Sequence, residues 1–391
     1  MPGSYIVAGA RTPIGKMSGA LASFSAADLG GVAIKAALER AGVAGNEIDH
    51  VIMGQVLMAG QGQVPSRQAA VKAGIPMNVP AVNINKVCLS GLNAIYLADQ
   101  MIQAGDADIV IAGGMESMTN APYLADGARG GFRYGNTELR DAIIADGLWC
   151  AFDACLMGLG TERYTGGGIS RAEQDDLAMK SNQRAAAAVD KLAEEIVPIS
   201  IPQRKGDPKI VATDEGVRAD TTMDTLATLK PAFDKEGTIT AANASQISDG
   251  ASAMVIMSEK AVKARGVTPL GQVVSYGMVA GPDSASLLTQ PSRAILAALA
   301  KVGMKVGDLN LFELNEAFAA VGIASMRDLG ISDDVVNVNG GAIALGHPIG
   351  MSGNRVALTL LHELRRRGGG VGAAALCGGG GQGDAIIVRT V

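Results

Sequence analysis

Histidine and cysteine are both rare in this chain, and their scarcity limits the chemistry available to it. The 391 residues include three histidines, so an imidazole base has only His50, His347 and His362 as candidates. Four cysteines are too few for a disulfide framework in a chain of this length, so we expect free thiols in a reducing, cytoplasmic compartment. Cys150 and Cys155 match no common zinc spacing, so we expect both to be structural and no metal to be bound.

Positive charge and long apolar runs are also limited. The chain has 33 Lys and Arg against 38 Asp and Glu, and its net charge of −5 provides no overall basic field for nucleic acid. No apolar run approaches the ~20 residues that a membrane helix needs, and residues 1–5 lack the layout of a signal peptide. We therefore expect partners other than nucleic acid or membrane.

Apolar residues and glycine are abundant by contrast. Hydrophobic residues make up 48% of the chain, which is ordinary for a globular protein and argues against disorder. A chain of 391 residues is longer than one compact core usually spans, so we expect two or three packed units. Glycine accounts for 52 residues, about twice its average share.

Two segments recur at nearly the same offset. Residues 38–49 read LERAGVAGNEID and residues 299–310 read LAKVGMKVGDLN, an offset of 261 (299 − 38 = 261). Ser352-Gly353 repeats Ser90-Gly91 at an offset of 262 (352 − 90 = 262). Two separate matches at nearly one offset indicate an internal duplication, with one half near each end of the chain.

Each half is predicted to alternate strands with helices. In the first, we expect a strand over 81–87, a turn over 88–91, a helix that ends at Gly105, and a buried strand over 109–112. In the second, we expect a strand over 335–339, a glycine-rich turn around His347, a helix with Val356 and Leu364 inward, and strands over 371–377 and 385–388. The pattern predicts an α/β fold in layers around a buried sheet.

The amino-acid composition changes between the halves, where glycine-rich turns, a charged amphipathic stretch over 170–195 and several prolines occur. This segment is too long for a loop, so we expect a packed insertion that can cover a site. We divide the chain into an N-terminal half, residues 1–118 with about 244–268, an inserted loop domain, residues 119–243, and a C-terminal half, residues 269–391.

Cys88 is the first candidate for chemistry. It follows a strand and precedes a helix whose free amide groups favour negative charge, and Lys86 is a near neighbour. Both effects would lower the pKa of the thiol and make it a better nucleophile. The alternative is a buried structural cysteine, which is what most free cysteines are.

Three further candidates lie at strand ends or turns. His347 stands between Gly346 and Pro348, which fix its backbone, and the alternative is a structural imidazole on a turn. We expect His50 and His362 to face solvent. Cys377 ends a strand and runs into a glycine string that satisfies G-x-G-x-x-G. Because a strand rather than a helix is expected to follow, we reject a dinucleotide site there. Asn315, before Glu316, is by itself typical of a helix cap for a helix that begins near 317.

Taken together, these segments resemble the thiolase family along essentially the whole chain, and specifically its short-chain acetyl-CoA acetyltransferases. The matching motifs are NKVCLSG at 85–91, GGMESM at 113–118, NEAF at 315–318, GGAIALGHPIG at 340–350 and CGGG at 377–380. The resemblance implies two duplicated α/β halves in a layered αβαβα architecture, with the inserted loop domain between them.

The resemblance also implies the roles of the site residues. Cys88 would be the nucleophile that takes the acyl group as a thioester, and His347 would activate it. Cys377 would be the second acid and base, which removes a proton from the α-carbon of acetyl-CoA. Asn315 would hold a water that forms one oxyanion hole with His347, and the backbone amides of Cys88 and Gly379 would form the other. A Claisen condensation develops charge on two carbonyl oxygens at different steps, which is why two such holes are wanted.

Coenzyme A is implied as a co-substrate, with no tightly bound cofactor. By resemblance, Arg218 would meet the nucleotide phosphates, Ser245 would bond the pantetheine arm, and four residues would line the channel, namely Leu148, Met157, Phe233 and Phe318. From the residues alone, the two phenylalanines are as consistent with core packing, and Arg218 with a solvated surface position.

One position departs from the family pattern. Many biosynthetic members carry histidine immediately before the equivalent of Met157, where this chain has Leu156. The retained methionine favours short acyl chains, whereas the lost histidine changes the polarity of the pocket. The segment around Gly130-Gly131 resembles the family's tetramerisation loop, which implies a homotetramer.

Four other functions are considered. A degradative 3-oxoacyl-CoA thiolase of broader chain length would use the same residues in the cleaving direction. A decarboxylating condensing enzyme would usually have two histidines, or a histidine and an asparagine, beside the cysteine nucleophile, and the acid/base thiol Cys377 argues against it. A non-catalytic CoA- or lipid-binding protein is expected to have lost Cys88, His347 or Cys377, and a cysteine hydrolase has no use for the second thiol.

Overall fold

The structure, a computed structural model, describes residues 4–165, 168–283 and 286–391. Its largest element is a ten-stranded mixed sheet. The strands are β1 Tyr5–Arg11, β2 Gly15–Lys16, β3 His50–Gly54, β4 Ala81–Ile84, β5 Ile109–Ser117, β12 Ser248–Met257, β13 Gly271–Ala280, β14 Leu311–Leu314, β15 Val371–Gly378 and β16 Gln382–Arg389.

The strand order repeats the duplication. In the first half, β3 pairs parallel with β5, β5 pairs antiparallel with β12, and β12 pairs antiparallel with β1. In the second half, β14 pairs parallel with β15, β15 pairs antiparallel with β16, and β16 pairs antiparallel with β13. The halves join where β1 meets β13, over only two residue pairs. The sheet therefore contains two copies of one strand arrangement, which are joined at β1 and β13.

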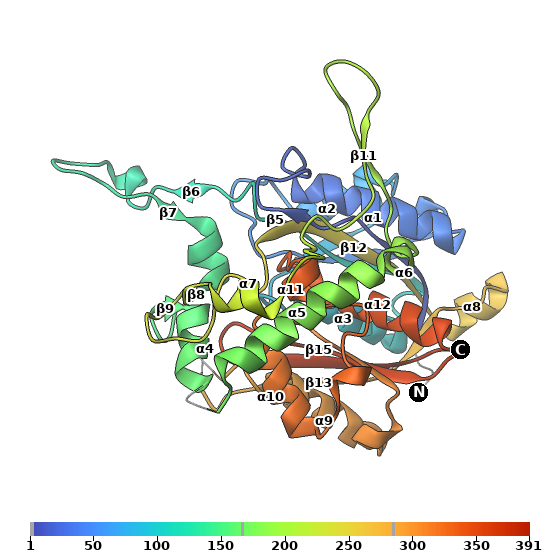
Figure 1. Cartoon of the computed structure of the whole chain (residues 1–391). Helices are drawn as coiled ribbons and strands as arrows, with labels where there is room; N and C mark the ends of the chain where they lie inside the picture. The colour runs from blue at the N-terminus through green and yellow to red at the C-terminus, as the bar shows by residue number, and fades with distance from the viewer. Residues whose placement is uncertain (1–3, 166–167, 284–285) are drawn as a thin grey trace.

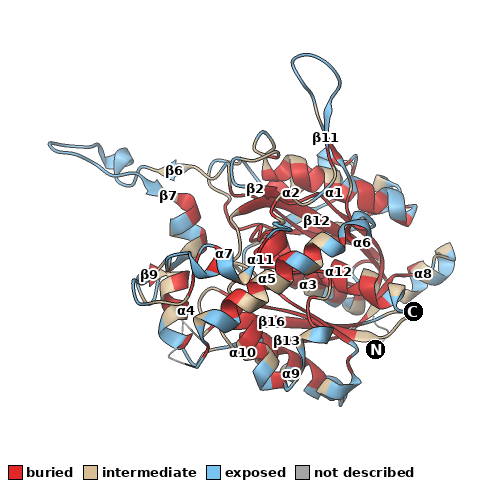
Figure 2. Cartoon of the chain, in the orientation of Figure 1, coloured by how far each residue is buried: buried red, intermediate tan, exposed pale blue. Residues whose placement is uncertain are grey.

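Helices separate and cover the two halves of the sheet. They are α1 Ala26–Ala41, α2 Pro65–Lys72, α3 Ser90–Ala104, α8 Glu259–Arg265, α9 Gln290–Val302, α10 Ala319–Leu329, α11 Ala342–Leu345 and α12 Ser352–Arg366. One apolar core joins α1 and α2 to the first half, a second contains α3 and α12 with strands of both halves, and a third joins α9 to the second half. The layers therefore alternate as αβαβα, with α3 and α12 in the middle and buried (Figures 1 and 2).

The repeated sequence segments have the same structure in both halves. Helix α1 ends at Gly42 and α9 ends at Gly303, and both glycines have the left-handed conformation of a helix C-cap. A 3-10 turn follows each, Gly45–Glu47 and Val306–Asp308, and each turn leads into a strand of the sheet. The repeated Ser-Gly pair also has the same structure in both halves. It begins α3 at Ser90 and α12 at Ser352, and the two helices have equal length.

Two glycines allow the central helices to meet at their N-terminal ends. A Cβ atom on Gly353 would lie 2.3 Å from the backbone nitrogen of Leu92, and one on Gly91 would lie 2.8 Å from that of Asn354. Only glycine permits such contact between backbones. The turn before α3 and the segment before α12 are thereby brought to the same place, and these segments carry Cys88 and His347.

The chain between the halves adds helices and short strands outside the large sheet. These are β6 Tyr123–Leu124, β7 Arg140–Asp141, β8 Trp149–Cys150, β9 Cys155–Leu156, α4 Met157–Thr165, α5 Arg171–Ala187, α6 Val189–Ala193, β10 Ile199–Ile201, β11 Lys209–Val211 and α7 Met223–Ala227. Two exposed projections leave the body, one beyond β6 and β7 and one beyond β10 and β11 (Figures 1 and 2). The boundaries at residues 119 and 243 stay a prediction.

The strand expected over 335–339 does not form. Residues Asp333–Val335 make a 3-10 turn, and Val336 makes a single bridge to Phe312. Asn337 has a φ of 45°, and its side chain accepts from the backbone N–H of Leu314 and donates to the carbonyl of Leu314, both at 2.8 Å. A side-chain amide thus occupies the place of a strand partner. The strand over 81–87 is also shorter than expected and ends at Ile84.

Two of the three histidines differ from expectation. His50 begins β3 and His362 lies in α12, and both are half-buried rather than facing solvent. Among the helices that the structure describes, none has the length and apolar character to cross a membrane.

Candidate active site

Cys88 lies in a strained turn between β4 and α3. The preceding residue, Val87, has a φ of 51°, which is unusual for a β-branched side chain and is typical of strain at functional sites. Ser90 stabilises this turn, because its Oγ accepts from the backbone N–H of Lys86 at 2.8 Å and donates to the carbonyl of Val87 at 2.6 Å. The sequence Lys86–Ser90 thus forms a compact turn that fixes the thiol at the start of the helix.

The electrostatic surroundings of Cys88 differ from those expected from the sequence. Burial raises the pKa of the thiol to about 12, although the backbone N–H groups of Cys88 and Gly379 favour the thiolate. The Lys86 ammonium is paired with Asp384 instead of stabilising the thiolate, because it donates to the two carboxylate oxygens of Asp384 at 2.7 and 2.9 Å. The prediction of a lowered thiol pKa was therefore wrong.

His347 is held as a neutral base. Its Nδ1 lies 2.6 Å from Ser352 Oγ, and that hydroxyl donates to the carbonyl of Pro348 at 2.9 Å. The hydroxyl proton is thus used, so Nδ1 carries the imidazole proton and Nε2 presents a lone pair. Burial, and secondarily the Arg355 charge, lowers the pKa of His347 to about 3.

Asn315 lies beside His347 rather than at a helix cap. Its Nδ2 is 3.4 Å from His347 Nε2, and its backbone N–H donates to the carbonyl of Ala375 on β15. Helix α10 begins at Ala319 with Phe318 as its N-cap, so the cap interpretation was wrong. Asn315 Oδ1 is buried and has no hydrogen-bond partner within the described ranges.

Cys377 lies near the end of β15. It is 2% exposed, and burial, followed by the Cys88 charge, raises its pKa well above the ordinary value. The loop from β15 into β16 consists of Gly379, Gly380 and Gly381, and the last two have positive φ values of 76° and 66°. The glycine string is thus a hairpin turn and precedes a strand, as expected when the dinucleotide site was rejected.

These residues surround one small cavity. It has a volume of about 60 Å³, and its lining includes eight predicted residues, namely Cys88, Leu148, Met157, Ser245, Phe318, His347, Cys377 and Gly379. Asn315 does not line the cavity but reaches it through His347. The structure thereby brings together residues that lie up to nearly 300 positions apart in the sequence.

A larger cavity adjoins the small one. Its volume is about 580 Å³, and both cavities share Leu148, Met157, Ser245, Ala317, Phe318 and His347 in their linings. Phe233 and Phe318 meet edge to face in its wall, with ring centroids 6.0 Å apart. Arg218 lines it and is exposed, and Leu156 lines it as well. The pair of cavities can hold a reacting group in the small one and a long, polar-ended carrier in the large one.

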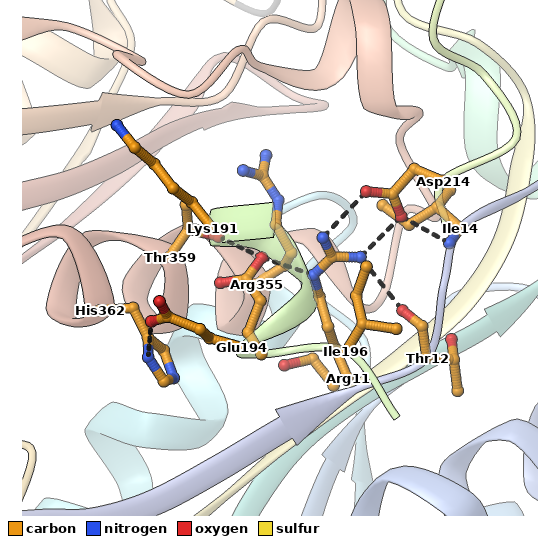
Figure 3. A network of polar contacts seen from close by, with 12 residues as sticks. Arg11, Thr12, Ile14, Lys191, Glu194, Ile196, Asp214, Arg355, Thr359 and His362 are labelled. Atoms are coloured by element: carbon orange, nitrogen blue, oxygen red, sulfur yellow. Dashed lines mark hydrogen bonds and ion pairs between the residues drawn. The ribbon is translucent and has the colours of Figure 1, made fainter. Parts of the chain in front are cut away.

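A buried ionic network holds the chain near Arg218 against the first strand. Arg11 donates to Glu195 at 2.6 Å and to both carboxylate oxygens of Asp214 at 2.7 and 2.9 Å. Asp214 also accepts from the backbone N–H of Ile14 at 2.8 Å (Figure 3). Since Asp214 lies four residues before Arg218, the network fixes part of the segment that lines the larger cavity.

Several residues that support the site were missed in the sequence. Ser352 fixes the His347 tautomer, and its repetition of Ser90 was the available signal. Glu116, whose pKa burial raises to about 7, accepts at 3.0 Å from the backbone N–H groups of Val56, Leu57 and Gly350. Glu316, next to Asn315, accepts from Ser181 Oγ at 2.7 Å. Both carboxylates lie in recognised motifs, but their partners are remote in the sequence.

Cys150 and Cys155 lie opposite each other on the short strands β8 and β9, and both are 4% exposed free thiols. Neither lines the two cavities described above. Over the described part of the chain, no group of three or more His, Cys, Asp or Glu residues is placed to hold a metal ion.

Comparison with known proteins agrees with this architecture. Residues 4–260 match the N-terminal domain of thiolase, and residues 267–390 match its C-terminal domain. The chain therefore belongs to the thiolase family.

Relatives match over nearly the whole length. A probable acetyl-CoA acetyltransferase of Mycolicibacterium smegmatis is 55% identical, and the match covers 98% of this chain and 100% of the relative. A probable acetyl-CoA acetyltransferase of Mycobacterium tuberculosis is 54% identical over 100% of both chains. The acetyl-CoA acetyltransferase of Cupriavidus necator is 52% identical over 98% of both.

Proposed function

We propose that this protein is an acetyl-CoA acetyltransferase, which reversibly condenses two acetyl-CoA molecules into acetoacetyl-CoA and free CoA through an acyl-cysteine intermediate. The observation that carries the proposal is that Cys88, His347 and Cys377 line one cavity of about 60 Å³. A single thiol and base would suffice for hydrolysis, whereas the second thiol provides a group for proton transfer to and from carbon. The names of the full-length relatives support the same activity.

In the first half-reaction, His347 Nε2 takes the Cys88 proton while the sulfur attacks the thioester carbon of acetyl-CoA. The C–S bond to CoA breaks, and Cys377 gives its proton to the departing CoA thiolate. The products are acetyl-Cys88, protonated His347 and the Cys377 thiolate. One thioester replaces another, so the step is readily reversible.

In the second half-reaction, the Cys377 thiolate removes a proton from the methyl group of a second acetyl-CoA. The resulting enolate carbon attacks the carbonyl of acetyl-Cys88, forms the new C–C bond and displaces the Cys88 thiolate. Protonated His347 returns its proton to Cys88. The backbone amides of Cys88 and Gly379 serve one developing oxyanion, and His347 with an Asn315-bound water serves the other.

The larger cavity is proposed to hold coenzyme A. Arg218, exposed and lining that cavity, would bind a phosphate group, and Ser245 would bond the pantetheine arm next to the reacting centre. Leu148, Met157, Phe233 and Phe318 would contact the apolar portion of the arm. CoA is a co-substrate here and is released in each cycle.

The acyl pocket is proposed to accept short chains. Met157 lines both cavities, and the small one offers little room beyond an acetyl or acetoacetyl group. Leu156 also lines the larger cavity and makes it more apolar than a histidine would. This residue is the one observation that favours broader chain length, so a degradative 3-oxoacyl-CoA thiolase is the second candidate.

We also propose a homotetramer in a reducing compartment such as the cytoplasm. The projection between β6 and β7 carries an exposed Phe132 and a fully exposed Tyr134, which an isolated subunit would leave in water. All four cysteines are free thiols, and the mechanism needs Cys88 and Cys377 reduced.

Steady-state cleavage of 3-oxoacyl-CoAs by CoA tests the activity. We expect cleavage of acetoacetyl-CoA to exceed that of the six- and eight-carbon homologues and to stop in Cys88→Ala. It should also stop in Cys377→Ala, in which acetylation of Cys88 by acetyl-CoA persists at a lower rate because CoA leaves without a proton from Cys377. Equal turnover of all chain lengths would support the degradative candidate. Release of free acid would indicate a hydrolase, and CoA binding without turnover would indicate a non-catalytic protein.

A further inference from the structure

A charged pair next to the candidate nucleophile takes no part in the mechanism above. Lys86 Nζ lies 2.7 and 2.9 Å from the two carboxylate oxygens of Asp384. The Asp384 side chain is fully buried, whereas that of Lys86 is 21% exposed. The two residues are 298 positions apart, so the pair joins the first half of the chain to the second.

The carboxylate is held from a second side. Tyr276 Oη donates to Asp384 Oδ2 at 2.7 Å, and the Tyr276 ring stacks on Tyr96 of α3 with centroids 4.6 Å apart. Asp384 is therefore fixed by strand β13 as well as by its own strand, β16. A buried carboxylate held in this way offers Lys86 one well-defined position rather than a mobile surface partner.

The pair spans the two segments that provide the amides of one proposed oxyanion hole. Lys86 lies two residues before Cys88, and Asp384 lies five residues after Gly379. The backbone N–H groups of Cys88 and Gly379 both favour the negative charge on the Cys88 sulfur. Their separation depends on how the strained turn at Val87 sits against the hairpin between β15 and β16.

We propose that the Lys86–Asp384 ion pair is a positioning clamp that sets the distance between the Cys88 turn and the Gly379 hairpin, and with it the geometry of the thiolate and oxyanion site. This inference rests on the proposed acyl-transfer function. Ser90 closes the turn internally but makes no bond to the hairpin, so it cannot set that distance. Lys86 lines neither of the two cavities described above, so it would act through position rather than by contact with substrate.

Asp384→Asn is the first test, because it preserves shape and the bond to Tyr276 while removing the charge, and it leaves Lys86 free to reach solvent. We expect the rate of Cys88 acylation by acetoacetyl-CoA to fall roughly 10- to 100-fold, since a misplacement of about 1 Å costs up to about 100-fold. The KM for acetoacetyl-CoA should change less than about threefold, because the CoA cavity is untouched.

Four matched variants separate positioning from general destabilisation. Lys86→Met should behave as Asp384→Asn, and Lys86→Arg should restore part of the rate. Tyr276→Phe keeps the ion pair, and Lys180→Met removes a lysine–aspartate pair remote from the cavity, at 3.0 Å to Asp333. Lys180→Met should leave acylation within about threefold of the native rate, whereas Tyr276→Phe, which keeps the ion pair but loosens Asp384, should lower the rate less than Asp384→Asn does. Thermal unfolding of each variant shows that it is folded.

Acylation within threefold of the native rate in folded Asp384→Asn and Lys86→Met would overturn the clamp. A loss in Lys180→Met equal to that in Asp384→Asn would do so as well, because it would show general destabilisation. The rate at which iodoacetamide alkylates Cys88 needs no substrate, and it should fall in the same two variants. That readout keeps the clamp testable if the native protein forms no acyl adduct, a result that would contradict the proposed function alone.

Discussion

At the scale of single residues, the candidate nucleophile Cys88 and the candidate base His347 are a thiol and a neutral imidazole rather than a thiolate–imidazolium ion pair. Burial raises the pKa of the Cys88 thiol to about 12 and lowers that of His347 to about 3. A thiol with a raised pKa stays protonated at neutral pH, and an imidazole with a lowered pKa stays unprotonated. The proton therefore moves from sulfur to nitrogen only as the thioester is attacked, when the new negative charge is received by the amides.

The pH dependence of Cys88 reactivity checks this arrangement. Alkylation of Cys88 by iodoacetamide, followed by peptide mapping, should rise about tenfold per pH unit from pH 7 to 10, because only the thiolate reacts. A plateau with a midpoint below pH 8 would contradict the account, since it would show a thiolate–imidazolium pair. Alkylation of the His347→Gln variant should keep the same slope, because the imidazole is already neutral over this range.

Ser352 is predicted to set which nitrogen of His347 carries the proton. In Ser352→Ala, Nδ1 loses its acceptor and the tautomer with a lone pair on Nε2 is no longer favoured. We expect kcat to fall roughly 10- to 100-fold, within the range of a general-base contribution, with little change in KM. Ser352→Thr retains the hydroxyl and is the control. Native kcat in a folded Ser352→Ala would mean that Asn315 alone orients the ring.

At the scale of elements, the packing of α3 against α12 brings the candidate residues together. Cys88 precedes α3, and His347 precedes α12. The sequence reveals both helices and their repeated Ser-Gly starts, because the hydrophobic periodicity and the motifs are local. It does not reveal that Lys86 turns toward Asp384, because that partner lies 298 residues away and depends on how the halves dock.

The failed strand over 335–339 has a similar cause. The segment alternates apolar and polar residues as a strand does, but Asn337 bonds the backbone of Leu314 through its side chain and adopts a left-handed φ of 45°. Local pattern cannot distinguish an asparagine that faces solvent from one that replaces a strand partner. The catalytic candidates were predictable from their motifs, whereas the groups that orient them depend on tertiary contacts.

Gly353→Ala tests the contact between the central helices. The new Cβ would lie 2.3 Å from the backbone nitrogen of Leu92, which cannot move aside as a side chain can. We expect a loss of about 3 kcal/mol in the free energy of unfolding, at the upper end of overpacking effects. Gly307→Ala, where a Cβ has no atom within 4 Å, should change it by less than about 0.5 kcal/mol. Urea denaturation measures both, and equal stabilities would refute the contact.

At the scale of the whole molecule, the site belongs to neither half alone. Cys88 comes from the first half, and His347, Asn315 and Cys377 come from the second. The inserted segment contributes Leu148, Met157 and Arg218 to the cavities. The two halves thus provide similar frameworks, in which the segment before α3 carries a thiol and the segment before α12 carries an imidazole.

The projection between β6 and β7 is predicted to hold dimers together as a tetramer. Phe132 is 52% exposed and Tyr134 fully exposed in the isolated chain, so the double variant Phe132→Ser, Tyr134→Ser should disfavour assembly. Light scattering should then report a dimer where the native protein gives a tetramer, with acetylation of Cys88 retained. A native protein of dimer mass would show that the projection has another purpose.

The central claim is that acyl transfer proceeds through Cys88, and intact-protein mass spectrometry tests it most directly. The protein is mixed with acetyl-CoA, acetoacetyl-CoA or longer 3-oxoacyl-CoAs, and the modified peptide is then mapped. The account predicts an acetyl adduct on Cys88 that added CoA discharges and that is absent in Cys88→Ala. A folded protein that forms no adduct with any of these thioesters, or that carries one on another residue, would contradict the account.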